Sequence, residues 1–468
     1  MISPEGNRLQ EVKGRKILVV GLGRSGIAAA LFLRRRGAQV TVSDARSAEA
    51  LSQEIPSLLE EGIAVEAGGH GLLTFRRQDL IVVSPGVPLD TPELTQVRAF
   101  GLPVIGELEL AARYLQGRIL AITGSNGKTT TTALCGEIFK AADFNVRVGG
   151  NIGIPVISLV EGSAADSWSV LEVSSFQLES IESFHPHIAM ILNLTPDHLD
   201  RHGSFANYVA AKERIFLNQT AEDFLVLNGD DPAAQQAAAR AKAAVFWFSR
   251  SKLLRRGAFV SHGMVVYRPS ETASPLSVLP VADIPLKGEH NVENVLAAVC
   301  AACIAGAPVE AVAGAVRAFR GVEHRLERVA TIRGVAYFND SKATNVDAAI
   351  KAMQAFPTKI HLILGGKDKD SDYSQLHPLL KERVKAVYTI GSAAAKIERQ
   401  IAGAASVVRA ETLENAVKLA AGAASAGDVV LLAPACSSFD QFENYEHRGR
   451  VFKDLVAALE KADAWQNA

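Results

Sequence analysis

The segment AITGSNGKTT, residues 121–130, constrains the fold more than any other part of the chain. An apolar run that passes through closely spaced glycines into Lys and Thr predicts a buried strand, a phosphate-binding loop and a helix in succession. The usual loop is G-x-x-x-x-G-K-[ST], and counting back from Gly127 places Ile122 where the first glycine should stand. This loss changes how the chain enters the loop and leaves the anion pocket intact.

The rest of the loop keeps the chemistry of a triphosphate site. Backbone amides would surround a phosphate, the Lys128 amine would contact the outer phosphates, and the Thr129 hydroxyl would bind Mg²⁺. A loop that binds no nucleotide is the alternative interpretation. The residues that we assign to the nucleotide here are Gly124, Ser125, Asn126, Gly127, Lys128, Thr129 and Thr130.

A second glycine loop, GLGRSG at residues 21–26, follows an apolar run and precedes a helical pattern, and Asp44 ends the next apolar run. This context suits a diphosphate at a helix N-terminus, from either a nicotinamide cofactor or a nucleotide sugar. A tight turn without a ligand is the alternative. Two phosphate sites are more than a dehydrogenase needs, and they suit a ligase that uses ATP on a second, phosphate-bearing substrate.

Short apolar runs alternate with helical patterns along the whole chain, which predicts an α/β fold with parallel sheets covered on both faces. We expect three domains: a Rossmann-like domain at 1–106, a central P-loop-type domain with a mostly parallel sheet at 107–322, and a C-terminal Rossmann-like domain at 323–468. Residues 244–286 indicate irregular β structure. A hairpin is expected to turn at Arg333-Gly334.

Composition excludes several classes of protein. The formal net charge of the 468-residue chain is −1, so charge gives no argument for a nucleic acid or an anionic membrane. Four cysteines fit free thiols in a reducing compartment. Cys300 and Cys303 form a C-x-x-C motif inside an alanine-rich helical run, where core packing is favoured over a metal or redox site. We expect a soluble, cytoplasmic monomer without a membrane span.

Three motifs make the chain similar to a known family across essentially its whole length. TGSNGKTT, GEHNVENVLAA at 288–298 and GVEHRLE at 321–327 resemble the Mur ligases, ATP-dependent amino-acid ligases of peptidoglycan synthesis. Four finer motifs resemble the branch that adds D-glutamate to UDP-N-acetylmuramoyl-L-alanine. They are LEVSSFQLE (171–179), FNDSKATN (338–345), LGGKDK (364–369) and PACSSFDQFENYEHRG (434–449). The resemblance implies a reaction through an acyl phosphate, with ATP and two Mg²⁺ ions.

The resemblance also assigns metal ligands. It makes Glu172, at the end of an apolar run, and His198, in NLTPDHLDRHG, ligands of Mg²⁺ beside Thr129. The residues alone leave other interpretations open, because Glu172 could be an exposed strand end and His198 an ordinary surface or core histidine. The neighbouring His202 is expected to be solvated.

Lys212 lies on an apolar helical stripe, which should lower the pKa of its amine through desolvation. From the residues alone, a lysine that extends its amine to the surface of an amphipathic helix is the more common case. The resemblance implies instead a carbamylated lysine that helps to orient Mg²⁺. The proposed catalytic set is Lys128, Glu172, His198 and Lys212.

The remaining assignments follow from the resemblance. The adenine and ribose residues are Asn291, Asn294, Arg325 and Asp340. The residues assigned to D-glutamate are Thr344, Lys369, Ser438 and Tyr445. Lys342 is assigned to phosphate or to a substrate carboxylate. The uridine nucleotide residues are Arg24, Ser25, Asp44, Arg46, Gly86 and Asn151. For Asn291 and Asn294, the alternative role is helix capping. For Arg325, the alternative is an ion pair with Glu323 or Glu327. Tyr445 stands where the better-known relatives have Phe.

Two other functions remain open at this point. A nicotinamide-dependent oxidoreductase would use GLGRSG and leave the second loop, Glu172 and His198 without a role. A nucleotide-binding scaffold without catalysis is disfavoured by the presence of Lys128, Glu172 and Lys212.

Overall fold

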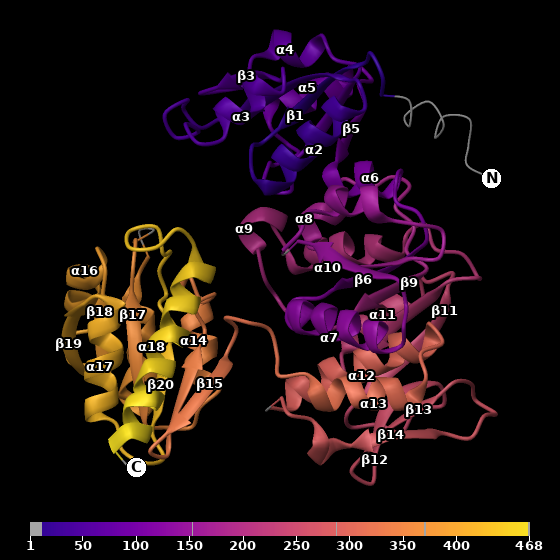
Figure 1. Ribbon diagram of the computed structural model, residues 1–468. Helices are drawn as coiled ribbons and strands as arrows, with labels where there is room; N and C mark the ends of the chain where they lie inside the picture. The colour runs from indigo at the N-terminus through magenta and orange to yellow at the C-terminus, as the bar shows by residue number, and fades with distance from the viewer. Residues whose placement is uncertain (1–11, 152, 287, 369–370, 467–468) are drawn as a thin grey trace. The chain divides into compact units, whose positions relative to one another are not determined.

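A computed structural model describes residues 12–151, 153–286, 288–368 and 371–466, and Figure 1 shows its elements. Contacts divide the chain into two compact units, Met1–Phe319 and Arg320–Ala468. The first unit holds two sheets and the second holds one, so the chain is an α/β protein with three sheets. Within the described part of the chain, no helix is long and apolar enough to cross a membrane.

The first sheet has five parallel strands in the order β3-β2-β1-β4-β5. Its central strands are apolar on both faces because helices cover both sides. Its strands are β1 (Lys16–Val20), β2 (Gln39–Asp44), β3 (Ala64–Ala67), β4 (Leu80–Val83) and β5 (Val104–Gly106). Its helices are α2 (Arg24–Arg35), α3 (Ile55–Glu60), α4 (Leu72–Arg76) and α5 (Pro92–Ala99).

The second sheet has nine strands in the order β14-β13-β12-β11-β10-β9-β6-β8-β7. From β7 to β12 neighbours pair in parallel, and β13 and β14 add antiparallel strands. Its strands are β6 (Arg118–Thr123), β7 (Val146–Gly150), β8 (Trp168–Glu172), β9 (Ile188–Ile191), β10 (Phe224–Asn228), β11 (Ala244–Ser249), β12 (Gly257–Ser261), β13 (Met264–Arg268) and β14 (Leu276–Pro280). The expected β structure at 244–286 is confirmed, although β11 and β12 extend the parallel sheet in regular register and only the β13–β14 pairing shifts register, near Val265.

Helices of the second sheet include α7, α12 and α13, which pack against one another. The full set is α6 (Glu107–Ala112), α7 (Lys128–Ala141), η1 (Val156–Gly162), α8 (Ser175–Leu178), α9 (Leu199–His202), α10 (Phe205–Glu213), η2 (Arg214–Phe216), α11 (Pro232–Ala238), η3 (Val281–Asp283), α12 (Glu289–Ile304) and α13 (Val309–Ala318). Both cysteines of the C-x-x-C motif lie on α12 as free thiols, and burial raises their pKa values, that of Cys303 to about 12. Core packing is therefore confirmed.

The second unit contains a six-stranded sheet in the order β15-β16-β20-β17-β18-β19, of which only β15 runs antiparallel to its neighbour among the described strands. The predicted hairpin is confirmed, since Arg333 and Gly334 turn it with left-handed backbone at φ 50° and 77°. Its strands are β15 (Glu327–Ile332), β16 (Val335–Asn339), β17 (Ile360–Gly365), β18 (Val384–Ile390), β19 (Ser406–Glu411) and β20 (Val429–Leu432). Its helices are α14 (Val346–Gln354), η4 (Tyr373–Leu376), α15 (His377–Arg383), α16 (Ala394–Gln400), α17 (Leu413–Ala423) and α18 (Tyr445–Gln466).

Candidate active site

The topology of the second sheet brings three polar segments to one edge. Strands β9, β6 and β8 are parallel neighbours, so their carboxyl ends lie side by side. The phosphate loop follows β6, Glu172 ends β8, and the segment from Asn193 to His198 follows β9. Ligands bind at this edge in open α/β sheets.

The phosphate loop requires glycine at two points. Gly124 and Gly127 have φ values of 152° and 84°, which other residues rarely adopt. A Cβ atom at Gly127 would stand 2.2 Å from Oδ1 of Asn294, and the same atom at Gly124 would stand 3.0 Å from Cβ of Leu192. Each glycine therefore provides both a backbone angle and space.

Asn193 holds the loop from the neighbouring strand. Its carbonyl accepts from Ser125 N at 2.9 Å, its Oδ1 accepts from Asn126 N at 2.8 Å, and its Nδ2 donates to Asn126 O at 3.1 Å. Sequence reasoning missed this residue. Its only signal is a polar side chain directly after an apolar strand, which many loops share.

Lys128 opens α7 and lies across its own loop. The Nζ atom donates to the carbonyl oxygens of Gly124 at 2.9 Å and Ser125 at 3.0 Å. Thr129, in the first turn of the helix, is 9 % exposed. The amine and the hydroxyl therefore stand at the loop where a triphosphate site needs them.

Lys212 of α10 is buried, with 2 % of the residue exposed. Its Nζ donates to Gly124 O at 2.9 Å and to Thr123 Oγ1 at 3.3 Å, and it lies 4.7 Å from the ring centroid of Tyr208. Burial lowers the pKa of the amine to about 7, with help from the charge of Lys128. The predicted pKa depression is confirmed, and the alternative of a lysine reaching the surface is wrong because the amine is enclosed.

Glu172 is also buried, at 2 % exposure, so the alternative of an exposed strand end is wrong. Its Oε1 accepts from Nδ2 of Asn151 at 3.0 Å. The Glu172 and Asp197 charges oppose the depression of the Lys212 pKa, which places these carboxylates within electrostatic reach of the amine. The sequence assigned Asn151 to the nucleotide sugar, and the structure brings it to the carboxylate.

His198 has left-handed backbone, at φ 50°, and its side chain is 51 % exposed. Its Nε2 lies 3.7 Å from Oδ2 of Asp197, and its ring lies 4.9 Å from that of Phe176. The ring is therefore accessible to a ligand.

The expectation that His202 is solvated is wrong. This residue is buried, stacks on Phe176 with ring centroids 5.6 Å apart, and has Nε2 3.0 Å from Oγ of Ser175. Burial lowers the pKa of the imidazole, so the buried ring is neutral near pH 7. Its role here is to hold α9 against α8.

Asn294 and Asn291 of α12 share a hydrogen bond, from Nδ2 of Asn294 to Oδ1 of Asn291 at 3.1 Å. The capping alternative is wrong, because the helix begins after Gly288 without a side-chain cap. Since Oδ1 of Asn294 faces Gly127, this pair adjoins the phosphate loop.

The first glycine loop is held by Asp44. Its carboxylate accepts from Leu22 N at 2.7 Å and from the Arg46 backbone and guanidinium at 2.9–3.0 Å. Burial alone would raise the pKa of Asp44, but the hydrogen bonds from Arg46 and Leu22 outweigh it and lower the pKa to about 2. The carboxylate thus ties the Leu22 amide to Arg46. Arg24 and Gly86 are exposed nearby, and Ser25 is half-buried.

In the second unit, Asp340 is buried next to Arg325. Burial raises the pKa of its carboxyl to about 6, opposed by Arg325, by the Leu326 N–H and by Lys342. The alternative partners of Arg325, Glu323 and Glu327, both bind Lys453 instead.

The residues assigned to D-glutamate lie at the carboxyl edge of this third sheet. Ser438 is buried, Thr344 and Lys342 are half-buried, and Lys369 lies outside the described residues. Tyr445 contributes its backbone, because its carbonyl accepts from Oγ of Ser341 at 2.8 Å.

Arg448 is a site residue that sequence reasoning missed. It is fully buried, its Nε donates to Oγ of Ser341 at 2.9 Å, and its terminal nitrogens donate to the carbonyls of Ser341 and Cys436. Burial lowers the pKa of the guanidinium to about 10. The arginine joins FNDSKATN to PACSS; it lies within the quoted motif at 434–449, but sequence reasoning gave it no role.

A P-loop sheet accompanied by two further open α/β sheets defines a class of three-domain nucleotide-using proteins. The sequence matches the profiles described as Mur ligase MurD-like, N-terminal domain, over 15–106, Mur ligase middle domain over 122–302, and Mur ligase, glutamate ligase domain over 324–436. The chain belongs to the Mur ligase family.

Relatives with high identity share one printed name, UDP-N-acetylmuramoylalanine–D-glutamate ligase. The chain is 71 % identical to that of Acidobacterium capsulatum over 98 % of its own length and 99 % of the relative. It is 59 % identical to that of Koribacter versatilis over 96 % of its own length and 98 % of the relative.

Among solved structures, the chain is similar to UDP-N-acetylmuramate-alanine ligase MurC from Thermotoga maritima, with a TM-score of 0.55 and 21 % identity. The match covers 95 % of this chain and 99 % of the MurC chain. The MurF ligase of the same organism in complex with ADP gives a TM-score of 0.55 at 16 % identity, with coverage of 96 % and 97 %. At these identities the likeness shows the fold alone.

Proposed function

We propose that this protein is an ATP-dependent ligase that joins D-glutamate to UDP-N-acetylmuramoyl-L-alanine in the cytoplasmic synthesis of peptidoglycan precursors. The observation that carries the proposal is the buried Lys212 amine on the phosphate loop, 2.9 Å from Gly124 O, at the same sheet edge as Glu172. The shared name of the full-length relatives supports the choice of substrates.

The reaction has two steps. A carboxylate oxygen of the muramoyl-alanine attacks the γ-phosphorus of ATP, the bond to the β-phosphate oxygen breaks, and ADP leaves. The amine of D-glutamate then attacks the acyl carbon, the acyl–oxygen bond breaks, and phosphate leaves with that oxygen while the nitrogen loses a proton. Because anions react with anions in both steps, cations must neutralise charge and hold the groups in line.

Lys128 and the loop amides fix the phosphates in this proposal. The amine lies within hydrogen-bond distance of two loop carbonyls, which keeps its positive charge at the loop. Asn294 stands against Gly127, which supports its assignment to the nucleotide. The family resemblance assigns Arg325 and Asp340 to the adenine and ribose of ATP.

Mg²⁺ fits the oxygen groups at this edge. Glu172 is a buried carboxylate whose one amide partner leaves acceptor capacity, and Thr129 supplies a hydroxyl, which are ligand types that Mg²⁺ prefers. His198, an exposed imidazole, is the third candidate, and we propose two ions. When bound, Mg²⁺ neutralises phosphate charge.

We propose that Lys212 carries a carbamate. The uncharged amine attacks CO₂, a C–N bond forms, and a proton leaves to solvent. With a pKa of about 7, roughly half of the amine is uncharged at pH 7, whereas an ordinary lysine is almost wholly protonated. The resulting carboxylate would orient the metal beside the loop.

Substrate recognition is divided among the sheets in this proposal, with domains at 1–106, 107–322 and 323–468. The uridine nucleotide is held by Arg24, Ser25, Asp44, Arg46, Gly86 and Asn151. D-Glutamate is held by Lys342, Thr344, Lys369, Ser438 and Tyr445. We expect a monomer.

Phosphate release from ATP, measured with a panel of amino acids, tests the function. Release should require both UDP-N-acetylmuramoyl-L-alanine and D-glutamate. Lys128→Met should abolish it, while Lys140→Met, which removes an exposed amine from the same helix, should not. Release with L-alanine in place of D-glutamate would contradict the substrate assignment.

A further inference from the structure

The turn that carries Arg325 is strained on both sides. His324 and Leu326 adopt left-handed backbone, with φ values of 64° and 42°. Such angles are unfavourable for residues with a Cβ atom, so the turn persists only where other contacts hold it. Arg325 itself is exposed, and its direction depends on the turn.

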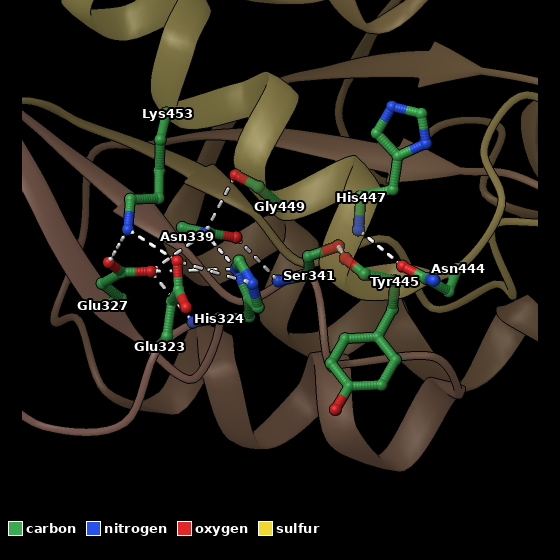
Figure 2. A network of polar contacts seen from close by, with 10 residues as sticks. All are labelled: Glu323, His324, Glu327, Asn339, Ser341, Asn444, Tyr445, His447, Gly449 and Lys453. Atoms are coloured by element: carbon green, nitrogen blue, oxygen red, sulfur yellow. Dashed lines mark hydrogen bonds and ion pairs between the residues drawn. The ribbon is translucent and has the colours of Figure 1, made fainter. Parts of the chain in front are cut away.

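One carboxylate holds the turn to two other elements. Oε2 of Glu327 accepts from His324 N at 2.9 Å and from Nδ2 of Asn339 at 3.1 Å. Its Oε1 accepts from Nζ of Lys453, on α18, at 2.6 Å. Figure 2 shows these contacts: one carboxylate oxygen of Glu327 binds the 324–326 turn, and the other binds Lys453 of α18.

Asn339 extends the network to Asp340. Its Nδ2 lies 2.9 Å from Nδ1 of His324 and 3.2 Å from the carbonyl oxygen of Gly449, so its two protons are shared among these atoms and Glu327 (Figure 2). Burial lowers the pKa of the His324 imidazole. The residues directly before Arg325 and Asp340 are thus bonded to each other, and the Leu326 N–H donates to the Asp340 carboxylate.

The same cluster has the composition of a cation site, because ligand atoms of Glu323, His324 and Glu327 lie within 4.8 Å of one another. Lys453 already supplies the positive charge, with Nζ 2.9 Å from Glu323 and 2.6 Å from Glu327. A metal would have to displace this ammonium. The arrangement therefore favours a structural role for the two carboxylates.

We infer that Glu327 is a positioning residue for nucleotide binding, which holds the 324–326 turn so that Arg325 stands beside Asp340. The inference rests on the proposed function, in which Arg325 and Asp340 contact ATP. Glu327 touches neither residue's side chain and acts through His324 and Asn339.

The substitution Glu327→Gln tests the inference at nearly constant volume. The new amide nitrogen must face either Lys453 or the two N–H donors on the other side, so one set of hydrogen bonds is lost. We expect the KM for ATP to rise about tenfold, while the KM values for D-glutamate and for the nucleotide sugar change less than about twofold. Glu398→Gln is the matched control, because it breaks a carboxylate pair with Arg409 in the same unit.

A double-mutant cycle with Arg325→Ala separates positioning from general destabilisation. If Glu327 acts through Arg325, adding Glu327→Gln to the Arg325→Ala variant leaves the KM for ATP unchanged. An equal rise in both backgrounds, or a parallel rise in all three KM values, would overturn the inference. If Arg325→Ala alone does not alter the KM for ATP, the proposed nucleotide role of Arg325 fails instead.

Lys453→Met provides a second variant should Glu327→Gln fold poorly. It removes the outer partner of Glu327 and leaves the bonds to His324 and Asn339 in place. A smaller rise in the KM for ATP, again absent in the Arg325→Ala background, is expected. A rise that persists in that background would count against the inference.

Discussion

The Nζ atom of Lys212 lies 2.9 Å from the carbonyl oxygen of Gly124, so a lysine from α10 is bonded to the phosphate loop that follows β6. The amine is enclosed by Tyr208 and Thr123 and lies within electrostatic reach of Lys128. Burial is the main reason that the pKa of Lys212 falls to about 7, and the charge of Lys128 adds to the effect. This relationship underlies the first two predictions.

Replacing Lys212 by Ala should lower kcat by at least about 100-fold, because the proposed carbamate disappears. Acetate or formate should restore part of the activity by filling the vacated space. Initial rates of phosphate release, with and without these carboxylates, measure the effect. Lys140→Ala is the control, and undiminished turnover in the Lys212 variant would remove the carbamate from the account.

Lys212→Met should change how stability depends on pH in buffer free of CO₂. The pKa is lowered in the folded state, from 10.5 to about 7, so the wild-type fold is penalised below pH 7 and gains stability between pH 7 and 10.5. The methionine variant lacks this dependence. Urea unfolding measured from pH 7 to 10 gives the free energy of unfolding of both proteins. The amount by which the methionine variant exceeds the wild type should shrink with rising pH, by at most about 1.4 kcal/mol per pH unit. A gap that is constant with pH would show that the amine titrates normally.

Asn193→Ala should raise the KM for ATP roughly tenfold and leave that for the nucleotide sugar unchanged, because two hydrogen bonds to Asn126 are lost. Steady-state kinetics with each substrate varied in turn provide the measurement. Asn218→Ala removes a comparable amide from the same unit, on the carbonyls of Glu182 and Phe184, and should have no such effect.

Asp44→Ala should weaken binding of the nucleotide sugar about tenfold without altering the KM for ATP. The carboxylate fixes both the Leu22 amide and the Arg46 guanidinium, so its loss releases two groups of the first glycine loop. Calorimetric titration with UDP-N-acetylmuramoyl-L-alanine measures the affinity. Equal losses for both nucleotides would point to unfolding of the unit.

The parts of the fold that could be predicted are those set by local sequence. Apolar runs identified the central strands, and the glycine spacing located both loops, since each signal lies within about ten residues. Residues 244–286 were predicted only as irregular β structure because their pattern is broken by turns; β11 and β12 extend the parallel sheet, and β13 and β14 add antiparallel strands.

The parts that could not be predicted depend on which strands become neighbours. Asn193 reaches Asn126 only because β9 pairs with β6, and Arg448 reaches Ser341 across 107 positions of sequence. His202 stands among charged residues and suggested solvent, yet the packing of α9 on α8 buries it against Phe176. Such contacts depend on which strands and helices become neighbours, and the spacing of residues along the sequence does not determine this.

Transfer of oxygen from substrate to phosphate tests the central claim most directly. UDP-N-acetylmuramoyl-L-alanine labelled with ¹⁸O in its alanine carboxylate is incubated with ATP, Mg²⁺, D-glutamate and the enzyme, and the released phosphate is analysed by mass spectrometry. Activation as an acyl phosphate predicts one ¹⁸O atom in each phosphate formed. Phosphate released without the label would contradict the account.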